Sequence, residues 1–333
     1  MTDPVRWAII GTAGIAGRTF LPSLDYVGGG EARVVAGRDA DRTARFARDH
    51  GVQHAVSDYQ EALADPQVDA VYVPLPNSMH AQWAMAALEA GKAVLCEKPL
   101  CSSLEETQRL LAVAAKTGLP MWEAIAFLFR SQTDRFLELI ADGAIGEVRE
   151  IQSSFHFTLR PGDIRLSAQL AGGALADVGC YPIRLARLVF GSEATGVRAS
   201  QRLTDGGVDA ETWGVLDFPG DRRLLFSCGF DKAYDTTTRV LGMSGELRLS
   251  RPFAGTPVDT IELLRPDAEP IVEHANGPDP QFAGLVRHIH AVLRDGASPR
   301  HLAVADAAGN AAVIDAVRRS AAQAPESVNL SAP

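Results

Sequence analysis

Short apolar runs alternate with helical stretches through the first third of the chain, and this alternation restricts the fold more than any other feature. The runs expected to form buried strands are 7–10, 32–36, 70–73, 93–96 and 121–126. The helices expected between and after them are 15–25, 42–49, 78–90, 104–117 and 134–141. Parallel strands need crossover connections of this kind, which are almost always right-handed. Residues 1–122 are therefore predicted to form a doubly wound α/β domain with a parallel sheet.

The pattern changes after residue 148. Alternating residues over 148–159 predict a strand, and further strands are expected at 214–218, 224–230, 239–243 and 246–249. The turns between them are too short for crossover helices, which predicts a largely antiparallel, open sheet. Helices are expected at 282–294 and 304–322, the second rich in alanine and packed back on the first domain. A length of 333 residues fits this second, α+β domain over 123–333, with substrate binding and oligomerisation as its expected roles.

Composition excludes several classes of function. No apolar stretch is long enough to span a bilayer, although 46% of the residues are hydrophobic, and a net charge of -9 disfavours binding to nucleic acid. The first strand begins within a few residues of Met1, so no signal peptide is expected, and we expect a cytoplasmic protein without a membrane partner. Cys96, Cys101, Cys180 and Cys228 have no paired spacing, so neither a disulfide framework nor a metal site is predicted.

A glycine-rich turn follows the first expected strand directly and opens the first expected helix. In this context such a turn cradles a pyrophosphate, because backbone N–H groups at the helix N-terminus face the ligand. The expected cofactor-binding residues here are Gly11, Thr12, Ala13, Gly14, Ile15 and Ala16. Ala13 replaces the second glycine of the GxGxxG pattern, and alanine still allows close approach of the backbone. The alternative is a tight turn of the kind found in any α/β protein.

The type of dinucleotide depends on the end of the second expected strand. An acidic residue there bonds the ribose 2′-hydroxyl of NAD, whereas an arginine suits the 2′-phosphate of NADP. Gly37 stands where the acid would be and Arg38 follows it, which favours NADP, while Asp39 leaves NAD open. In the alternative interpretation Asp39 only caps the next helix and Arg38 is a solvated charge.

Two short segments supply groups for chemistry. The segment Glu97-Lys98-Pro99 ends a strand and places Lys98 at its carboxyl end, where open α/β sheets bind ligands. The segment 172–182 opens with glycines and starts a helix on which Asp177 and Tyr181, four residues apart, share a face. We expect the ammonium and the phenol to meet in one cleft. Alternatively, Tyr181 is an ordinary helix aromatic, Lys98 a solvated strand end and Asp177 a charge favoured by the helix dipole.

The segments 11–16, 74–77 with His80, 97–99 and 172–182 together resemble the Gfo/Idh/MocA oxidoreductases, and the resemblance spans the chain. It implies an N-terminal Rossmann domain, a nicotinamide cofactor, and a C-terminal domain whose open sheet forms homodimers or homotetramers. The cofactor-binding residues that it implies are Pro74, Leu75, Pro76, Asn77, His80, Glu97 and Lys98. Of these, Pro76, Asn77 and His80 would lie near the nicotinamide ribose. Asp177 and Tyr181 would lie in the substrate cleft.

Tyr181 replaces the histidine that much of the family carries at this position. With the segments 73–76, 162–165 and 181–184, it resembles the nucleotide-sugar C-3 ketoreductases of deoxysugar and antibiotic biosynthesis. Sugar C-3 dehydrogenases that act on an aminoglycoside or related glycoside before transamination are the second alternative, and dimeric dihydrodiol dehydrogenases share the tyrosine. A non-catalytic dinucleotide-binding regulator is an alternative of another class, and the retention of Lys98 and Tyr181 speaks against it.

Hydride transfer to or from a sugar carbon requires a proton to move at the oxygen. We expect Tyr181 to exchange that proton with the C-3 oxygen. Lys98 would lower the pKa of Tyr181 and polarise the oxygen, and Asp177 would orient Lys98 or a sugar hydroxyl.

Five further residues are expected at the substrate. Arg160, Asp163 and Arg165 stand in a glycine-interrupted loop, where they would bind sugar hydroxyls or a diphosphate, and a surface ion pair is the alternative. Trp122 and Glu123 are expected to line the cleft.

Overall fold

The computed structural model describes residues 3–253, 259–275 and 279–323. Its N-terminal part is built on a six-stranded parallel sheet in the order β3-β2-β1-β4-β5-β6. The strands are β1 Val5–Ile10, β2 Gly30–Ala36, β3 His54–Val56, β4 Ala70–Val73, β5 Ala93–Cys96 and β6 Met121–Glu123. The strand order reverses between β1 and β4, and open α/β sheets bind ligands at the carboxyl ends of the strands at such a point.

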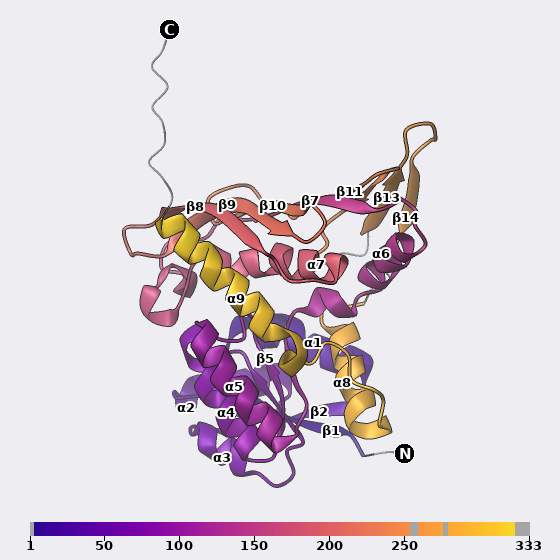
Figure 1. The fold of residues 1–333 in the computed structure, drawn as a ribbon. Helices are drawn as coiled ribbons and strands as arrows, with labels where there is room; N and C mark the ends of the chain where they lie inside the picture. Colours follow the sequence, from indigo (N-terminus) through magenta and orange to yellow (C-terminus); the bar gives the residue numbers. More distant parts are fainter. Residues whose placement is uncertain (1–2, 254–258, 276–278, 324–333) are drawn as a thin grey trace.

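Helices cover both faces of this sheet (Figure 1). They are α1 Leu21–Val27, which follows a π-helical turn at Ala16–Phe20, α2 Ala40–His50, α3 Tyr59–Ala64, α4 His80–Glu89 and α5 Leu104–Thr117. Their ends follow from capping residues. The side chain of Ser103 accepts a hydrogen bond from the amide of Glu106 at the start of α5, and Gly118 ends this helix in the left-handed conformation.

The C-terminal part is an eight-stranded sheet in the order β14-β13-β12-β11-β7-β10-β9-β8, antiparallel except for the β7–β10 pair. Its strands are β7 Val148–His156, β8 Gly196–Leu203, β9 Asp209–Phe218, β10 Arg222–Gly229, β11 Thr238–Gly242, β12 Glu246–Leu249, β13 Thr260–Leu264 and β14 Ile271–His274. Helices α6 Ser131–Ala141 and α7 Cys180–Phe190 lie on one side of this sheet, and Figure 1 shows the opposite side without helices.

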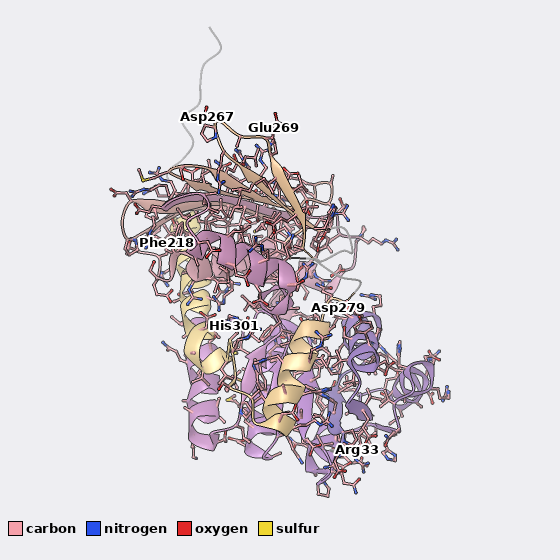
Figure 2. The ribbon with its side chains drawn as sticks, turned by 90° about the vertical axis from the view of Figure 1, so that its right-hand side faces the viewer. Arg33, Phe218, Asp267, Glu269, Asp279 and His301 are labelled. Carbon is pink, nitrogen blue, oxygen red and sulfur yellow. The ribbon has the colours of Figure 1, made fainter. Side chains whose placement is uncertain are left out.

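Two C-terminal helices pack back on the N-terminal part, and the second of them also reaches the C-terminal sheet. Helix α8, Ala283–Asp295, packs on α1, and its His290 accepts a hydrogen bond from Trp7 Nε1 at 3.1 Å. Helix α9, Ala303–Ala322, contacts α5 and β6 at one end and β8 at the other, and it runs diagonally between the sheets in Figure 1. In Figure 2, His301, which precedes α9, lies below Phe218 of the second sheet and above Arg33 of the first sheet. No helix among the described residues has the length and apolar character needed to cross a membrane.

The predicted fold class is confirmed: a parallel, doubly wound sheet is followed by a mostly antiparallel one. Several boundaries differ from the prediction. The strand expected at 121–126 ends at Glu123 and a 3₁₀ turn follows at Ala126–Phe129, while the strand expected at 148–159 ends at His156. The elements that the sequence analysis did not predict are β3, α3, β8, β13 and β14. Of these, β14 is an edge strand of only four residues, too short to show the alternation on which a strand prediction depends.

Candidate active site

The candidate site lies at the carboxyl ends of β1, β4 and β5. Gly11 has a φ of 113°, and a Cβ added there would lie 2.9 Å from Leu75 Cδ2, so glycine allows the turn after β1 to approach the loop after β4. The buried ring of His80 joins the loops after β4 and β5, because its nitrogens lie 2.7 Å from the Leu75 carbonyl oxygen and 2.8 Å from that of Pro99. His80 therefore shapes these loops and does not itself line the pocket between them.

A pocket of about 210 Å³ opens at this point. It is lined by Ala13, Gly14, Ile15, Arg18, Pro74, Leu75, Pro76, Asn77, Glu97, Lys98, Ile164, Arg165, Leu170, Gly172 and Asp177. These residues come from the glycine-rich turn, the loops after β4 and β5, and the C-terminal domain. The Asn77 side chain donates a hydrogen bond to the Ala171 carbonyl oxygen at 2.8 Å, which joins the two domains at the rim of the pocket.

Lys98 and Asp177 form a buried ion pair within this pocket. Lys98 Nζ lies 2.6 Å from Asp177 Oδ1 and also donates to the Asp177 carbonyl oxygen at 2.7 Å, and their side chains are only 13% and 11% exposed. Arg165 Nε lies 2.8 Å from the other carboxylate oxygen. Burial alone would raise the pKa of Asp177, but the positive charges of Lys98 and Arg165 hold it below its ordinary value. Burial likewise opposes the charge of Lys98, yet Asp177 raises the pKa of the ammonium.

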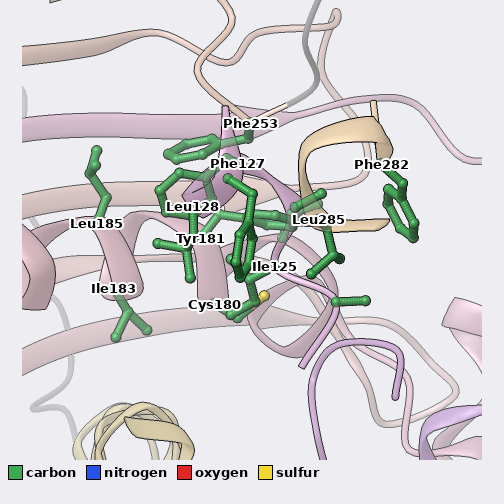
Figure 3. Packing of buried hydrophobic residues seen from close by; sticks show 14 of the residues in the cluster. Ile125, Phe127, Leu128, Cys180, Tyr181, Ile183, Leu185, Phe253, Phe282 and Leu285 are labelled. Atoms are coloured by element: carbon green, nitrogen blue, oxygen red, sulfur yellow. The ribbon is translucent and has the colours of Figure 1, made fainter. Parts of the chain in front are cut away.

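Tyr181 lies next to this pair. Lys98 Nζ lies 5.5 Å from the centre of its ring, which packs against Phe127, Phe155 and Phe253 at centroid distances of 6.1, 5.5 and 5.4 Å. Figure 3 shows the ring among the buried apolar side chains. No described residue forms a hydrogen bond with its hydroxyl group, and Tyr181 is 8% exposed and does not itself line the pocket.

The pKa of Tyr181 differs from the expectation. Burial raises it, and the positive charge of Lys98 offsets only part of that effect. Lys98 does lower the pKa of Tyr181, as predicted, but burial outweighs this effect and the pKa lies above its ordinary value, not near the working pH. The sequence predicts that the two groups meet, but it does not predict how far the aromatic neighbours remove the phenol from water.

Backbone geometry explains why the segment 172–182 reaches the site. A Cβ at Gly172 would lie 2.2 Å from the Arg165 carbonyl oxygen, so this glycine lets the loop carrying Arg165 pass close to the segment. Asp209 of β9 accepts a hydrogen bond from the Leu175 amide at 2.6 Å, at the start of a π-helical turn over Leu175–Gly179. Asp177 lies in this turn and Tyr181 in the first turn of α7. Turns of this kind are frequent at functional sites.

The residues expected to distinguish NADP from NAD follow β2. A Cβ at Gly37 would lie 2.3 Å from Thr43 Oγ1, which keeps this position small. Asp39 caps α2 by accepting a hydrogen bond from the Arg42 amide at 3.0 Å, as the alternative interpretation proposed. Arg38 is exposed and pairs with no described residue. Arg42, which the sequence analysis did not select, donates to the carbonyl oxygen of Thr12 in the glycine-rich turn at 3.1 Å, so two arginines flank this end.

Trp122 and Glu123 do not line the cleft, which corrects the expectation for both. Trp122 is fully buried and its Nε1 donates to the Arg300 carbonyl oxygen at 3.1 Å. Glu123 is also buried and accepts a hydrogen bond from the Leu100 amide at 2.8 Å. Both belong to β6, which is the edge strand of the sheet and is covered by α9, so they lie away from the switch point between β1 and β4.

The loop residues divide between the pocket and solvent. Arg165 lines the pocket and pairs with Asp163 at 3.3 Å as well as with Asp177. Asp163 accepts a hydrogen bond from the Arg165 amide at 2.9 Å and so shapes the loop. Arg160 is exposed and does not line the pocket, so its expected place at the substrate is not supported. Arg18 also lines the pocket but was not predicted from the sequence. Its guanidinium lies against Gly14. Its position four residues after that glycine, on the same helix face, could have indicated this contact.

Comparisons with known proteins agree with this architecture. The model of the GFO_IDH_MocA oxidoreductase family, described as an NAD-binding Rossmann fold, matches residues 5–124, and the GFO/IDH/MocA C-terminal domain matches residues 134–248. The chain belongs to the Gfo/Idh/MocA oxidoreductase family. This confirms the family that the sequence analysis identified.

Relatives with different activities are similar over most of the chain. The dTDP-3,4-didehydro-2,6-dideoxy-alpha-D-glucose 3-reductase of Actinomadura kijaniata is 36% identical over 324 residues, with 96% of each chain covered. The D-xylose 1-dehydrogenase (NADP(+)) 2 of Haloferax volcanii is 33% identical, covering 89% of this chain and 91% of the relative. The solved structure of a 3-ketoreductase from Actinomadura kijaniata with NADP and TDP-benzene has a TM-score of 0.88, 36% identity, and coverage of 96% and 98%. That enzyme was also solved as variants with a lysine or a tyrosine replaced.

Proposed function

We propose that this family member is an NADP-dependent oxidoreductase that transfers a hydride between nicotinamide and C-3 of a sugar. The preferred substrate class is a nucleotide-linked keto sugar of deoxysugar biosynthesis, with reduction as the working direction. The observation that carries the proposal is the buried Lys98–Asp177 ion pair, which lines a pocket together with the glycine-rich turn and lies 5.5 Å from the centre of the Tyr181 ring. The 3-ketoreductase relative, with NADP and TDP-benzene bound, supports the same substrate class.

The residues at the pocket fit a nicotinamide dinucleotide. Gly14 brings the backbone of the glycine-rich turn close to the positive charge of Arg18, since a Cβ added there would lie 2.4 Å from the Arg18 guanidinium. Gly11 to Ala16 would hold the pyrophosphate, and Pro74 to Asn77 with Glu97 and Lys98 would surround the nicotinamide end. Arg38 and Arg42 would bind the 2′-phosphate of NADP, while NAD would find no acidic partner at Gly37. The bound dinucleotide supplies the hydride.

The residues of the chain then donate the proton to the substrate oxygen and stabilise the negative charge that develops on it. Tyr181 donates its hydroxyl proton to the substrate oxygen, and its raised pKa keeps it in the neutral, proton-donating form. Lys98 stabilises the negative charge that develops on the same oxygen. Asp177, itself held by Arg165, keeps the ammonium in place through the contact of 2.6 Å. Arg165 also lies at the rim, where it can bind a sugar hydroxyl or a diphosphate.

The decisive experiment follows nicotinamide absorbance with NADPH and a panel of dTDP-linked 3-keto sugars, free sugars and aminoglycosides, and identifies the products by mass spectrometry. We expect reduction at C-3 of a nucleotide-linked keto sugar. Tyr181→Phe should lower kcat by about 100-fold or more, since positioned acid–base groups contribute about that much. Near-normal turnover of this variant would contradict the assignment of the proton donor. Dinucleotide binding without turnover of any panel member would favour the regulator instead.

We also propose that the protein works in the cytoplasm as a homodimer or homotetramer. Figure 1 shows one side of the C-terminal sheet without helices. Within this sheet Trp213 of β9 is 44% exposed and Val272 of β14 is 51% exposed, so apolar side chains are available for contact between copies. Sedimentation should detect a dimer or larger assembly, and Trp213→Glu should weaken it. A wild-type monomer at micromolar concentration would contradict this part of the proposal.

A further inference from the structure

Glu123 is a buried carboxyl group that the proposed reaction does not use. It ends β6, opposite Cys96 of β5, and its side chain turns toward the loop that carries Lys98. Glu123 Oε1 accepts a hydrogen bond of 2.8 Å from the amide of Leu100, two residues after Lys98. Leu100 is 3% exposed and Glu123 is 9% exposed, so the Leu100 amide has little access to water as an alternative partner.

Glu123 also shares a small cavity with residues next to the other groups of the site. It lines a small cavity of about 20 Å³ together with Pro99, Leu100, Ala176 and Asn310, among others. The wall of this cavity therefore includes the chain neighbours of Lys98 and of Asp177. Asn310 of α9 donates a hydrogen bond of 3.3 Å to the carbonyl oxygen of Cys180, which precedes Tyr181. Residues next to all three groups, or bonded to their chain neighbours, thus line this one cavity.

We propose that Glu123 is a positioning residue for Lys98, which it holds against Asp177 by fixing the backbone of the following loop through the Leu100 amide. Its effect on turnover rests on the proposed function, whereas its effect on the position of Lys98 does not. Without an acceptor at residue 123, the buried Leu100 amide must find another partner, and the loop moves to provide one. A displacement of about 1 Å in a reacting group lowers turnover by about 100-fold.

The charge of Glu123 gives this role a signature in the pH profile. The titratable and charged groups that act on it are Cys96, Lys98, Cys101, Cys180, Arg184 and Asp306. Burial, opposed by the hydrogen bond from the Leu100 amide and by the positive charges of Arg184 and Lys98, raises the pKa of Glu123 to about 7. Above that pH the bond from the Leu100 amide is charge-assisted and therefore stronger. The ammonium is then held more firmly, so turnover should fall as the pH drops through 7.

The test compares the wild type with Glu123→Gln, Glu123→Leu and the control Glu106→Gln. Glutamine keeps an oxygen acceptor for Leu100 but cannot ionise, while leucine removes the acceptor at similar size. Glu106 accepts a hydrogen bond from the Ser102 amide in the same loop, at the start of α5, so it controls for loss of a nearby carboxylate. For each protein we would measure kcat, KM, NADPH affinity and the pH profile, and determine a crystal structure.

We expect Glu123→Leu to lose about 100-fold in kcat with NADPH affinity changed by less than about threefold, and to lose the contact between Lys98 Nζ and Asp177 Oδ1 in its crystal structure. Glu123→Gln should stay within about tenfold of wild-type kcat and lose the inflection near pH 7, while Glu106→Gln keeps it. An unchanged Lys98–Asp177 contact in the leucine variant would overturn the proposal even if no substrate is found. If that variant does not fold, an inflection near pH 7 that persists in Glu123→Gln would overturn it.

Discussion

Replacing Asp177 by asparagine tests the centre of the site most directly. The substitution keeps the size of the side chain but removes the negative charge between Lys98 and Arg165. Lys98 and Asp177 are 13% and 11% exposed, and removing one member of a buried ion pair costs about 3–5 kcal/mol because the other charge stays unpaired. Arg165 is 41% exposed, so water can replace its lost partner and its share is about 0–1 kcal/mol. We therefore expect the free energy of unfolding at pH 7 to fall by about 4 kcal/mol.

Thermal unfolding followed by circular dichroism measures this effect. For a domain of about 200 residues, a loss of about 4 kcal/mol lowers Tm by about 8–16 °C. The folded state holds the pKa of Asp177 below its ordinary value, so its stabilising effect is present above the ordinary pKa and is lost as the pH falls through the folded value. The difference between wild type and variant should therefore be largest near neutral pH and should shrink below about pH 4.

A matched control separates this effect from the loss of any carboxylate. Asp69 forms an ion pair of 3.0 Å with Arg6, but the two side chains are 37% and 31% exposed. Asp69→Asn should cost no more than about 1 kcal/mol, as exposed pairs do. If Asp177→Asn lowers Tm no more than Asp69→Asn does at pH 7, or if its deficit does not change with pH, the buried pair is not the source of stability that the structure indicates.

Two further predictions concern the cofactor and the contact between domains. Arg38→Ala and Arg42→Ala should each weaken NADPH binding by about tenfold and leave NADH binding within about twofold, measured by nicotinamide fluorescence; equal loss for both dinucleotides would place the 2′-phosphate elsewhere. Burial lowers the pKa of His290 to about 4, and its ring accepts a hydrogen bond from Trp7, which a protonated ring cannot do. Because the unfolded chain takes up this proton first, Tm should fall as the pH drops from about 6.5 toward 4. His290→Gln should flatten that slope, and an identical slope would contradict this account.

The sequence predicted the fold best where a single local signal determines the element. The run Ala93–Cys96 is apolar and fully buried in β5, and Gly118 ends α5 at the predicted residue. The prediction failed where tertiary contacts replace that signal. His54–Val56 forms β3 only by pairing with β2, and its residues are mostly exposed. Ile271–His274 forms β14 by pairing with β13 at the edge of the sheet.

The site divides in the same way. Lys98 and Asp177 could be selected because a strand end and a helix start have recognisable sequences, and the structure brings the two side chains together at 2.6 Å. Which way Glu123 faces could not be predicted, because β6 is only three residues long and α9, about 180 residues later in the chain, covers it. The direction of the pKa shift of Tyr181 could not be predicted either, because it depends on the burial of Tyr181 among Phe127 and other aromatic residues.

The neutral state of Tyr181 leads to the last prediction. Burial raises its pKa above the ordinary value of a phenol, so the side chain carries its proton throughout the neutral range. Reduction of a ketone uses that proton, whereas oxidation of an alcohol requires a phenolate that is scarce at pH 7. Because reduction consumes one proton, the ratio of kcat/KM for oxidation to kcat/KM for reduction must rise by about tenfold per pH unit. The charge state of Tyr181 determines which of the two kcat/KM values changes with pH. We expect kcat/KM for oxidation to rise with pH while that for reduction does not fall between pH 6 and 9. A tenfold fall in reduction for each pH unit above 7 would mean that Lys98 does bring the phenol into the neutral range once ligands are bound.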